Sequence, residues 1–387
     1  MLKSIIPYSK QYIDKNDIKN VAKVLRSKFL TTGPEVPIFE KLINKNCNSK
    51  YSIAVNSATS ALHIACLALG LKKNDIVWTT PISFVASANC AKYCGAKVDF
   101  VDIDIDTFNL CPLKLEEKLK KTKKKYLPKI VIPVHLGGQS CDMNKIYSLS
   151  KKYKFKIIED ASHAIGGKYR NNKVGNCKYS DVCVFSFHPV KIVTTGEGGI
   201  ATTNSYNLAK KMKIYREHGL VREVKFFKGK SHGPWHYQQQ ELGFNYRMSD
   251  IHAALGISQL SKIDKFIKKR NKISTIYKKE LRDLPIEFQK NKNNGLSTYH
   301  LFIILVPEKL HLKLFQFLRN KKIFINLHYI PIFLHPFFKK NIKIKNFGSA
   351  INYYNRAISL PAYYSLKEIE QKKVILLIKN FFYETKI

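Results

Sequence analysis

Residues 182–202 read VCVFSFHPVKIVTTGEGGIAT, two apolar runs around a polar, glycine-rich turn. Val182–Phe187 and Gly199–Thr202 each have the length and the β-branched or apolar content of a buried strand. Between them Pro189 restricts the backbone, and Lys191 follows two residues later. The stretch therefore predicts two buried strands with a lysine held on their short connection.

This connection also sets a hydroxyl group, that of Ser186, five residues before the Lys191 amine. A lysine that forms a Schiff base needs a stiff tether beside a group that binds an anion. Ser186 could supply the anion contact, and Lys191 the nucleophilic amine. Pyridoxal phosphate is the cofactor that this arrangement suggests.

Working outward, apolar strands alternate with amphipathic helices between residues 50 and 205, which is typical of an α/β fold with a mostly parallel sheet and helices on both faces. The other strands expected there are Val77–Thr80, Val98–Val101, Lys129–Val134 and Lys156–Glu159, and the expected helices include Thr59–Leu69, Ser83–Tyr93 and Met143–Tyr153. Beyond Asp250, long helices surround expected strands at Tyr299–Val306 and Phe324–Tyr329. We expect a large domain over residues 1–253 and a smaller C-terminal α+β domain over residues 254–387.

The composition is strongly basic, with 67 Lys and Arg against 28 Asp and Glu and a formal net charge of +39. Such a charge favours binding to nucleic acids. The densest basic run, residues 118–125, has no interleaved aromatic residues to stack on bases, and the lysines are spread along the chain. We therefore expect solvated basic faces, no nucleic-acid site, and a positive field that favours an anionic substrate.

The eight cysteines all fall in the first half of the chain and show no spacing typical of a metal site. No run of about 18 apolar residues occurs, and the start lacks the apolar stretch of a signal peptide. These features predict a reduced, cytoplasmic protein with no metal and no membrane contact.

Asp160 follows the apolar strand Lys156–Glu159 and so lies at the carboxyl end of a strand, where α/β sheets bind ligands. A carboxylate there could keep a pyridine nitrogen protonated. The alternative is an aspartate that caps the next helix. Together with a lysine about thirty residues later in the same α/β unit, the cofactor role is favoured.

Three more segments have both a functional and a structural interpretation. The hydroxyl residues of 57–60 open a helix whose free amide groups suit a phosphate, or they are ordinary N-caps. Phe84 could stack on a flat ring, or it packs in the core. Asn245 and Arg247 could both reach anions, or they belong to a plain surface loop.

Taken together, these segments resemble the sugar-nucleotide aminotransferases of the DegT/DnrJ/StrS family over essentially the whole chain. Further segments that carry the resemblance are IPYS (6–9), LTTGP (30–34), FE (39–40), VHLGGQ (134–139), GFNYR (243–247), LHYIP (327–331) and ISLP (358–361). The resemblance implies the type I fold of aspartate aminotransferase. It also implies pyridoxal phosphate as cofactor, and L-glutamate and a nucleotide sugar as substrates.

Within the family, NSATSAL (56–62), TTPISFVA (79–86) and SFHPVK (186–191) are similar to one branch. That branch makes UDP-4-amino-4,6-dideoxy-N-acetyl-β-L-altrosamine from the 4-keto sugar for pseudaminic acid. An enzyme for another dTDP-, GDP- or UDP-linked 4-keto sugar is the alternative. Family members that dehydrate the sugar carry histidine in place of the Schiff-base lysine, and Lys191 argues against them. A non-catalytic nucleic-acid-binding protein is a remote alternative that rests on the charge alone.

The resemblance also implies a role for each matching residue. Lys191 forms the Schiff base and moves the proton. The implied cofactor contacts are Asp160 to the ring nitrogen, His163 to the ring hydroxyl, Phe84 stacked on the ring, and Thr59, Ser60, Ser186 and Asn245 to the phosphate. Asn245 comes from the other subunit, which implies a homodimer with shared active sites.

The nucleotide-sugar pocket is the remaining site that the resemblance implies. Its lining would be formed by Tyr8, Lys28, Phe29, Leu30, Thr31, Arg247, His328 and Tyr329. The loop Phe226–Gln240 does not align with the family and is a candidate to shape this pocket. A second departure is Lys322, near which relatives carry a glycine that ends a helix, so we expect that this turn differs.

Overall fold

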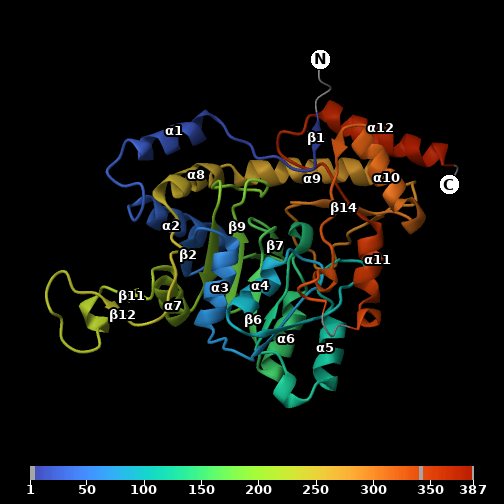
Figure 1. The fold of residues 1–387 in the computed structure, drawn as a ribbon. Coiled ribbons are helices and arrows are strands. Elements are labelled where there is room, and N and C mark those ends of the chain that lie inside the picture. Colours follow the sequence, from blue (N-terminus) through green and yellow to red (C-terminus); the bar gives the residue numbers. More distant parts are fainter. Residues whose placement is uncertain (1–4, 340–342, 386–387) are drawn as a thin grey trace.

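The computed structural model describes residues 5–339 and 343–385, and its centre is a seven-stranded sheet (Figure 1). In spatial order the strands are β2 (Tyr51–Val55), β10 (Gly199–Thr203), β9 (Val182–Ser186), β6 (Lys156–Asp160), β5 (Ile130–Ile132), β3 (Ile76–Thr79) and β4 (Lys97–Phe100). Only β10 runs against the others, antiparallel to both β2 and β9. The expected α/β fold with a mostly parallel sheet is confirmed.

The strand boundaries follow simple backbone chemistry. The expected strand Lys129–Val134 is shorter in the structure, because β5 ends at Ile132, immediately before a proline that has no N–H to donate. The predictions missed β2, although it leads directly into the 57–60 segment. The other expected strands of this sheet agree with the structure to within one residue at each end.

Helices cover both faces of the sheet (Figure 1). Successive residues of a strand point to opposite faces, so Ile158 of β6 packs in one core cluster and Ile157 in another. The first face is covered by α3 (Ala58–Ala68), α4 (Ala86–Tyr93) and α7 (Tyr206–Arg216). The second face is covered by α2 (Glu35–Cys47), α5 (Pro112–Lys121), α6 (Met143–Tyr153) and α8 (Asp250–Leu260).

The C-terminal part has its own apolar core around a three-stranded antiparallel sheet. Its elements are α9 (Ile263–Glu280), β13 (Glu287–Phe288), β14 (Phe302–Leu305), α10 (Glu308–Asn320), α11 (Gly348–Arg356), β16 (Ala357–Leu360) and α12 (Glu368–Glu384). The N-terminal strand β1 (Ile6–Pro7) pairs with β15 (Ile323–Phe324) of this part, so the beginning of the described chain packs on the C-terminal core. The expected domain boundary after residue 253 falls inside α8 and stays a prediction.

Two local expectations near the C-terminus had different outcomes. The expected strand Phe324–Tyr329 is mostly wrong, because only Phe324 belongs to a strand, β15, and Asn326 then forms an isolated bridge to Ser359 of β16. After α10, Lys322 adopts the left-handed conformation with φ 63°. A lysine therefore holds the left-handed conformation that favours glycine at the end of a helix.

A two-stranded hairpin, β11 (Leu220–Val221) with β12 (Gln238–Gln239), extends from the body beyond α7 (Figure 1). The loop Phe226–Gln240 forms its outer part, with Trp235 76% exposed.

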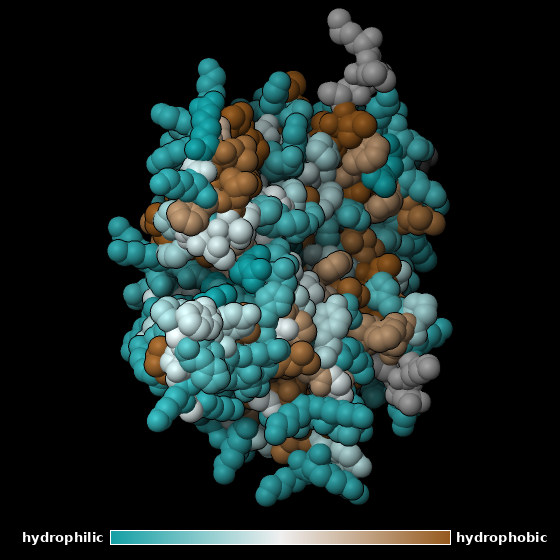
Figure 2. Space-filling model, turned by 60° about the vertical axis from the view of Figure 1, so that its left-hand side comes forward, coloured by the Kyte–Doolittle hydropathy of each residue, from teal (hydrophilic) through white to brown (hydrophobic). Residues whose placement is uncertain are grey.

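The N-terminal helix α1 (Lys15–Leu25) lies along α8. Figure 2 shows a mostly hydrophilic face interrupted by hydrophobic patches. Within the described residues, no helix has the length and apolarity that a membrane span needs.

Candidate functional site

A cavity of about 400 Å³ opens at the carboxyl ends of β6 and β9. The sequence-predicted residues that line it are Tyr8, Thr59, Phe84, Asp160, His163, Ser186, Lys191, His328 and Tyr329. They come from both ends of the chain and from the middle of it. The fold thus brings most of the predicted cofactor residues, and three of the predicted sugar-pocket residues, into one site.

Lys191 lies in a tight turn that follows β9, where its backbone N–H donates to the His188 carbonyl over 2.9 Å. The Ser9 hydroxyl donates to the Val190 carbonyl over 3.0 Å and ties this turn to the N-terminal segment. Burial lowers the pKa of the Lys191 amine to about 8, although the Asp160 carboxylate acts in the opposite direction. At pH 7 roughly a tenth of this amine is therefore uncharged and nucleophilic, far more than for an ordinary lysine.

Asp160 ends β6 with a carboxylate on the same face as α4. Its Oδ1 accepts the backbone N–H of Ser162 over 3.1 Å, and its Oδ2 accepts the Ser87 hydroxyl over 2.6 Å. The main chain is held as well, because the His135 N–H donates to the Asp160 carbonyl over 3.0 Å. The carboxylate is therefore presented to the cavity in one orientation, with an acceptor available to a ligand N–H.

His163 is a neutral imidazole at the floor of the cavity. Its Nδ1 accepts the Gly137 N–H over 3.3 Å, so its proton lies on Nε2, which is 3.1 Å from the Tyr329 hydroxyl. Burial lowers the pKa of His163 well below its ordinary value, and Lys191 and His328 act in the same direction. The Phe84 ring lies 6.2 Å from the ring of Tyr329 at the mouth of the cavity.

The start of α3 faces the cavity with its amide groups. Ser57 is the N-cap and accepts the Ser60 N–H over 3.1 Å, while the Ser60 hydroxyl donates to Asn56 over 2.6 Å. Gly199 of β10 lies directly beneath, and a Cβ at that position would come within 2.3 Å of the Ala58 nitrogen. Only a glycine lets this helix start approach the sheet so closely, next to Ser186.

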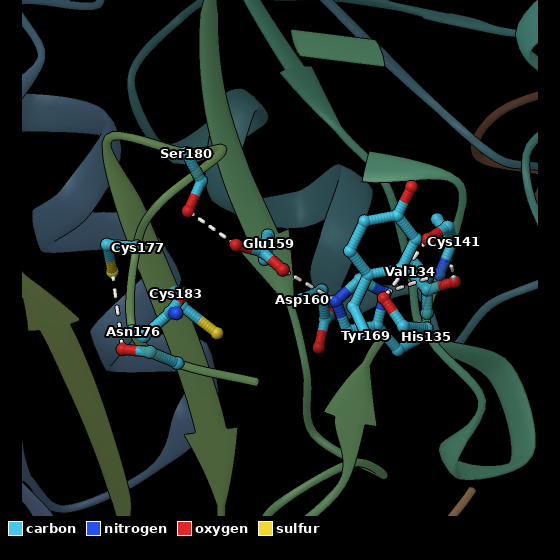
Figure 3. Close-up of polar contacts among 12 residues, drawn as sticks. Val134, His135, Cys141, Glu159, Asp160, Tyr169, Asn176, Cys177, Ser180 and Cys183 are labelled. Carbon is cyan, nitrogen blue, oxygen red and sulfur yellow. Dashed lines mark hydrogen bonds and ion pairs between the residues drawn. The ribbon is translucent and has the colours of Figure 1, made fainter. Parts of the chain in front are cut away.

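Behind Asp160, on the other face of the sheet, Glu159 belongs to a separate buried network. Figure 3 shows its carboxylate between Ser180 and His135. The Nε2 atom of His135 lies 2.8 Å from Glu159 Oε2, and the Ser180 hydroxyl donates to Oε1 over 2.5 Å. The Cys141 N–H donates to Nδ1 of His135 over 3.2 Å. This network secures the ends of β5 and β6 against each other below the cavity.

His328 and Tyr8 form another wall of the cavity, and their rings lie 4.9 Å apart. Nδ1 of His328 is 2.9 Å from the Ser359 hydroxyl. Burial lowers the pKa of His328 to about 3, with Lys191 acting in the same direction. His328 is therefore uncharged at neutral pH and offers hydrogen bonds without a positive charge.

Several predicted residues do not line this cavity in the single chain. Ser60 follows Thr59 in α3, and its hydroxyl is directed to Asn56. The segment 28–31 belongs to an exposed loop between α1 and α2. Asn245 bridges to Glu217 and Arg247 bridges to Val55, both on the approach from the hairpin to α8. Their predicted roles stay predictions.

Sequence reasoning assigned no role to some residues that line the cavity. His188 and Glu197 belong to the very stretch that identified Lys191, and Ser83 precedes Phe84. Their positions inside those motifs were the signal in the sequence that could have identified them as cavity residues.

Within the described residues, no group of three or more His, Cys, Asp or Glu side chains is arranged to hold a metal ion.

The donor set suits pyridoxal phosphate. Lys191 offers an amine, Asp160 an acceptor for a ring N–H, and the start of α3 with Ser186 a place for a phosphate, all in one cavity. The glycine beneath α3 leaves these amide groups accessible at the sheet edge.

Comparisons with known proteins agree with this geometry. The model of the DegT/DnrJ/EryC1/StrS aminotransferase family matches residues 11–379. A UDP-4-amino-4,6-dideoxy-N-acetyl-β-L-altrosamine transaminase from Campylobacter jejuni (strain 81-176) is 39% identical over 381 residues, which is 96% of each chain. A GDP-perosamine synthase from Vibrio cholerae is 31% identical and covers 98% of this chain and 99% of its own.

Among solved structures, the aminotransferase PseC from Helicobacter pylori, involved in the biosynthesis of pseudoaminic acid, superposes with a TM-score of 0.89 at 30% identity. The match covers 98% of this chain and 100% of PseC. The chain therefore belongs to the DegT/DnrJ/EryC1/StrS aminotransferase family and is a pyridoxal-phosphate-dependent sugar aminotransferase.

Proposed function

We propose that this enzyme moves an amino group from L-glutamate to the 4-keto carbon of a UDP-linked 6-deoxy-N-acetyl sugar. The product would be UDP-4-amino-4,6-dideoxy-N-acetyl-β-L-altrosamine, a precursor of pseudaminic acid. The observation that carries the reaction type is the Lys191 amine in one cavity with Asp160 and the start of α3. Support for the sugar comes from the Campylobacter transaminase, at 39% identity over 96% of both chains.

For the cofactor we propose the contacts that the cavity offers. Asp160 would pair with the ring nitrogen, His163 with the ring hydroxyl, and Phe84 with the face of the ring. Thr59 and Ser186 would hold the phosphate from the cavity wall, together with Ser60, which follows Thr59 in α3 and would have to release its hydrogen bond to Asn56. When bound, pyridoxal phosphate withdraws electrons from the carbon that loses a proton.

Lys191 is the residue that would move this proton. Removal of a proton from carbon requires an uncharged amine at Nζ, and a pKa near 8 keeps part of the lysine uncharged at neutral pH. In the same position, a protonated amine can return the proton in the second half of the reaction. A group whose pKa lies near the working pH can do both.

For the substrates we propose that Tyr8, His328 and Tyr329 bind the sugar. The nucleotide would be bound by Lys28, Phe29, Leu30, Thr31 and Arg247. The formal charge of +39 favours the approach of a substrate that carries a diphosphate.

We also propose a homodimer in which Asn245 contributes to the cofactor site of the second subunit. Two observations support this arrangement. Asn245 lies outside the cavity of its own chain, and α1 presents exposed apolar side chains, with Ile18 62% and Leu25 57% exposed.

The eight cysteines are free thiols, which supports a reducing, cytoplasmic location.

A half-reaction screen tests the substrate. The pyridoxamine phosphate form of the enzyme is mixed with a panel of 4-keto nucleotide sugars, and the absorbance of the pyridoxal phosphate form is followed. We expect the 6-deoxy UDP-N-acetyl sugar to react fastest. If a dTDP- or GDP-linked sugar reacts and the UDP sugar does not, the alternative substrate class replaces the proposed one. The similarity to GDP-perosamine synthase makes a GDP sugar the first competitor to include.

The reaction type is tested by Lys191→Ala, with Lys210→Ala on α7 outside the cavity as the control for charge. We expect Lys191→Ala to lose both the absorbance band of covalently held cofactor and turnover, and Lys210→Ala to keep both. Turnover retained by Lys191→Ala would overturn the proposed function.

A further inference from the structure

Next to Asp160, on the face of the sheet that α4 covers, two buried serines form a short series of hydrogen-bonded hydroxyl groups, of which Ser83 also lines the cavity. The Ser87 hydroxyl donates to Asp160 Oδ2 over 2.6 Å, and the Ser83 and Ser87 hydroxyl oxygens are 2.8 Å apart. Ser87 is fully buried and Ser83 is 3% exposed. Ser87 is separated from Asp160 by 73 positions in the sequence and is not among the residues that line the cavity.

The number of protons that each hydroxyl group carries fixes which group donates in these two hydrogen bonds. A serine hydroxyl carries one proton, and Ser87 uses its proton for Asp160. Ser83 must therefore be the donor in the contact with Ser87. Both hydroxyl groups thus donate toward the Asp160 carboxylate, and together they hold its Oδ2 atom in place.

A purely local role does not account for Ser87. It lies in the first turn of α4, where serine commonly accepts helix amide protons as a cap. Here the N-cap position is occupied by Val85, which makes no side-chain capping bond, and the Ser87 hydroxyl is directed across to β6. The hydroxyl is thus used for a contact between a helix and a strand.

We propose that Ser87, oriented by Ser83, is a positioning residue that holds the Asp160 carboxylate directed at the ring nitrogen of the cofactor. Oδ2 is held by Ser87 and Oδ1 by the Ser162 N–H, so rotation of the carboxylate would break both bonds. This inference rests on the proposed function, in which Asp160 is the partner of the ring nitrogen. Ser87 acts only through Asp160 and touches neither cofactor nor substrate.

The test is a double-mutant cycle on cofactor affinity, measured on the full-length protein by titration of the apoenzyme with pyridoxal phosphate. The variants are Ser87→Ala, Asp160→Asn and the double variant. We expect Ser87→Ala to raise the Kd for pyridoxal phosphate roughly tenfold, the scale of a hydrogen bond to a charged group. In the Asp160→Asn background the same change should have little effect, because the charge that Ser87 serves is gone.

Cys90→Ala provides the matched control. Cys90 is fully buried one turn further along α4, and its thiol is directed to the Ser87 carbonyl instead of Asp160. It should leave the Kd unchanged, and urea unfolding of every variant shows whether α4 still folds normally. Ser83→Ala, which removes only the second hydroxyl, should give a smaller rise in Kd than Ser87→Ala.

The outcomes separate this inference from the proposed function. If Asp160→Asn binds pyridoxal phosphate like the unmodified protein, the assigned role of Asp160 fails. If Asp160→Asn weakens binding and Ser87→Ala does not, only the positioning role of Ser87 fails. An equal effect of Ser87→Ala in both backgrounds would show a structural role for the serine and would also overturn the inference.

Discussion

Nε2 of His135 lies 2.8 Å from Oε2 of Glu159 beneath the sheet, directly behind the strand end that presents Asp160 (Figure 3). Glu159 and Asp160 are neighbours in β6, and their side chains enter opposite faces. One carboxylate serves the framework, while the other is offered to the cavity. The first prediction concerns this division.

Glu159→Ala should lower the free energy of unfolding by about 3 kcal/mol, because it leaves the buried His135 and the half-buried Ser180 without their partner. Urea denaturation followed by circular dichroism measures the change. As the control, Glu117→Ala removes an exposed pair with Lys121 on α5, and its denaturation midpoint should not move. Equal midpoints for both variants would contradict a structural role for the buried pair.

The pKa of Lys191 predicts how fast the apoenzyme captures pyridoxal phosphate. Only the uncharged amine attacks the aldehyde, and with a pKa of about 8 roughly a tenth of the lysines is uncharged at pH 7. The capture rate should therefore rise almost tenfold per pH unit below pH 7 and level off above pH 8. Stopped-flow absorbance measures it. A rate still rising steeply at pH 10 would indicate an ordinary, exposed lysine.

Gly199→Ala should disturb the phosphate end of the cavity. The added Cβ would lie 2.3 Å from the Ala58 nitrogen, so the start of α3 must move away from the sheet. We expect a loss of pyridoxal phosphate affinity of at least tenfold, measured by equilibrium titration. Gly348→Ala is the control, because a Cβ there meets nothing within 4 Å. Unchanged affinity in Gly199→Ala would show that this helix start does not hold the phosphate.

Lys322→Gly should stabilise the protein by about 0.5–1 kcal/mol. Lys322 has φ 63°, a conformation that costs a residue with a Cβ more than it costs glycine. The neighbouring helix C-cap, Lys321, has φ −81°, so Lys321→Gly should be destabilising instead. Thermal unfolding of both variants checks the opposite signs, and a shared sign would contradict the conformational argument.

Local patterns in the chain were sufficient to predict most of the fold, and they pointed to several of the residues that line the cavity. Lys191 and Asp160 each follow an apolar strand whose β-branched content is visible in a few consecutive residues. Because β9 and β10 pair antiparallel, residues 187–198, which carry Lys191, can join them without a crossover helix. The strand expected at Phe324–Tyr329 failed for the opposite reason: its composition suits a strand, but past Phe324 the chain turns to bring His328 and Tyr329 into the cavity.

The pairs that set the chemistry of the site join residues far apart in the chain, and no local pattern reveals them. The Ser87 hydroxyl meets Asp160 across 73 positions, and the Tyr329 hydroxyl meets His163 across 166. Strand and helix preferences depend on neighbours within a few residues, so the chain alone predicted elements and candidate residues but not these long-range contacts. Which face each group enters, and the burial that brings the pKa of Lys191 to about 8, depend on the packing of distant segments and were decided by the tertiary structure.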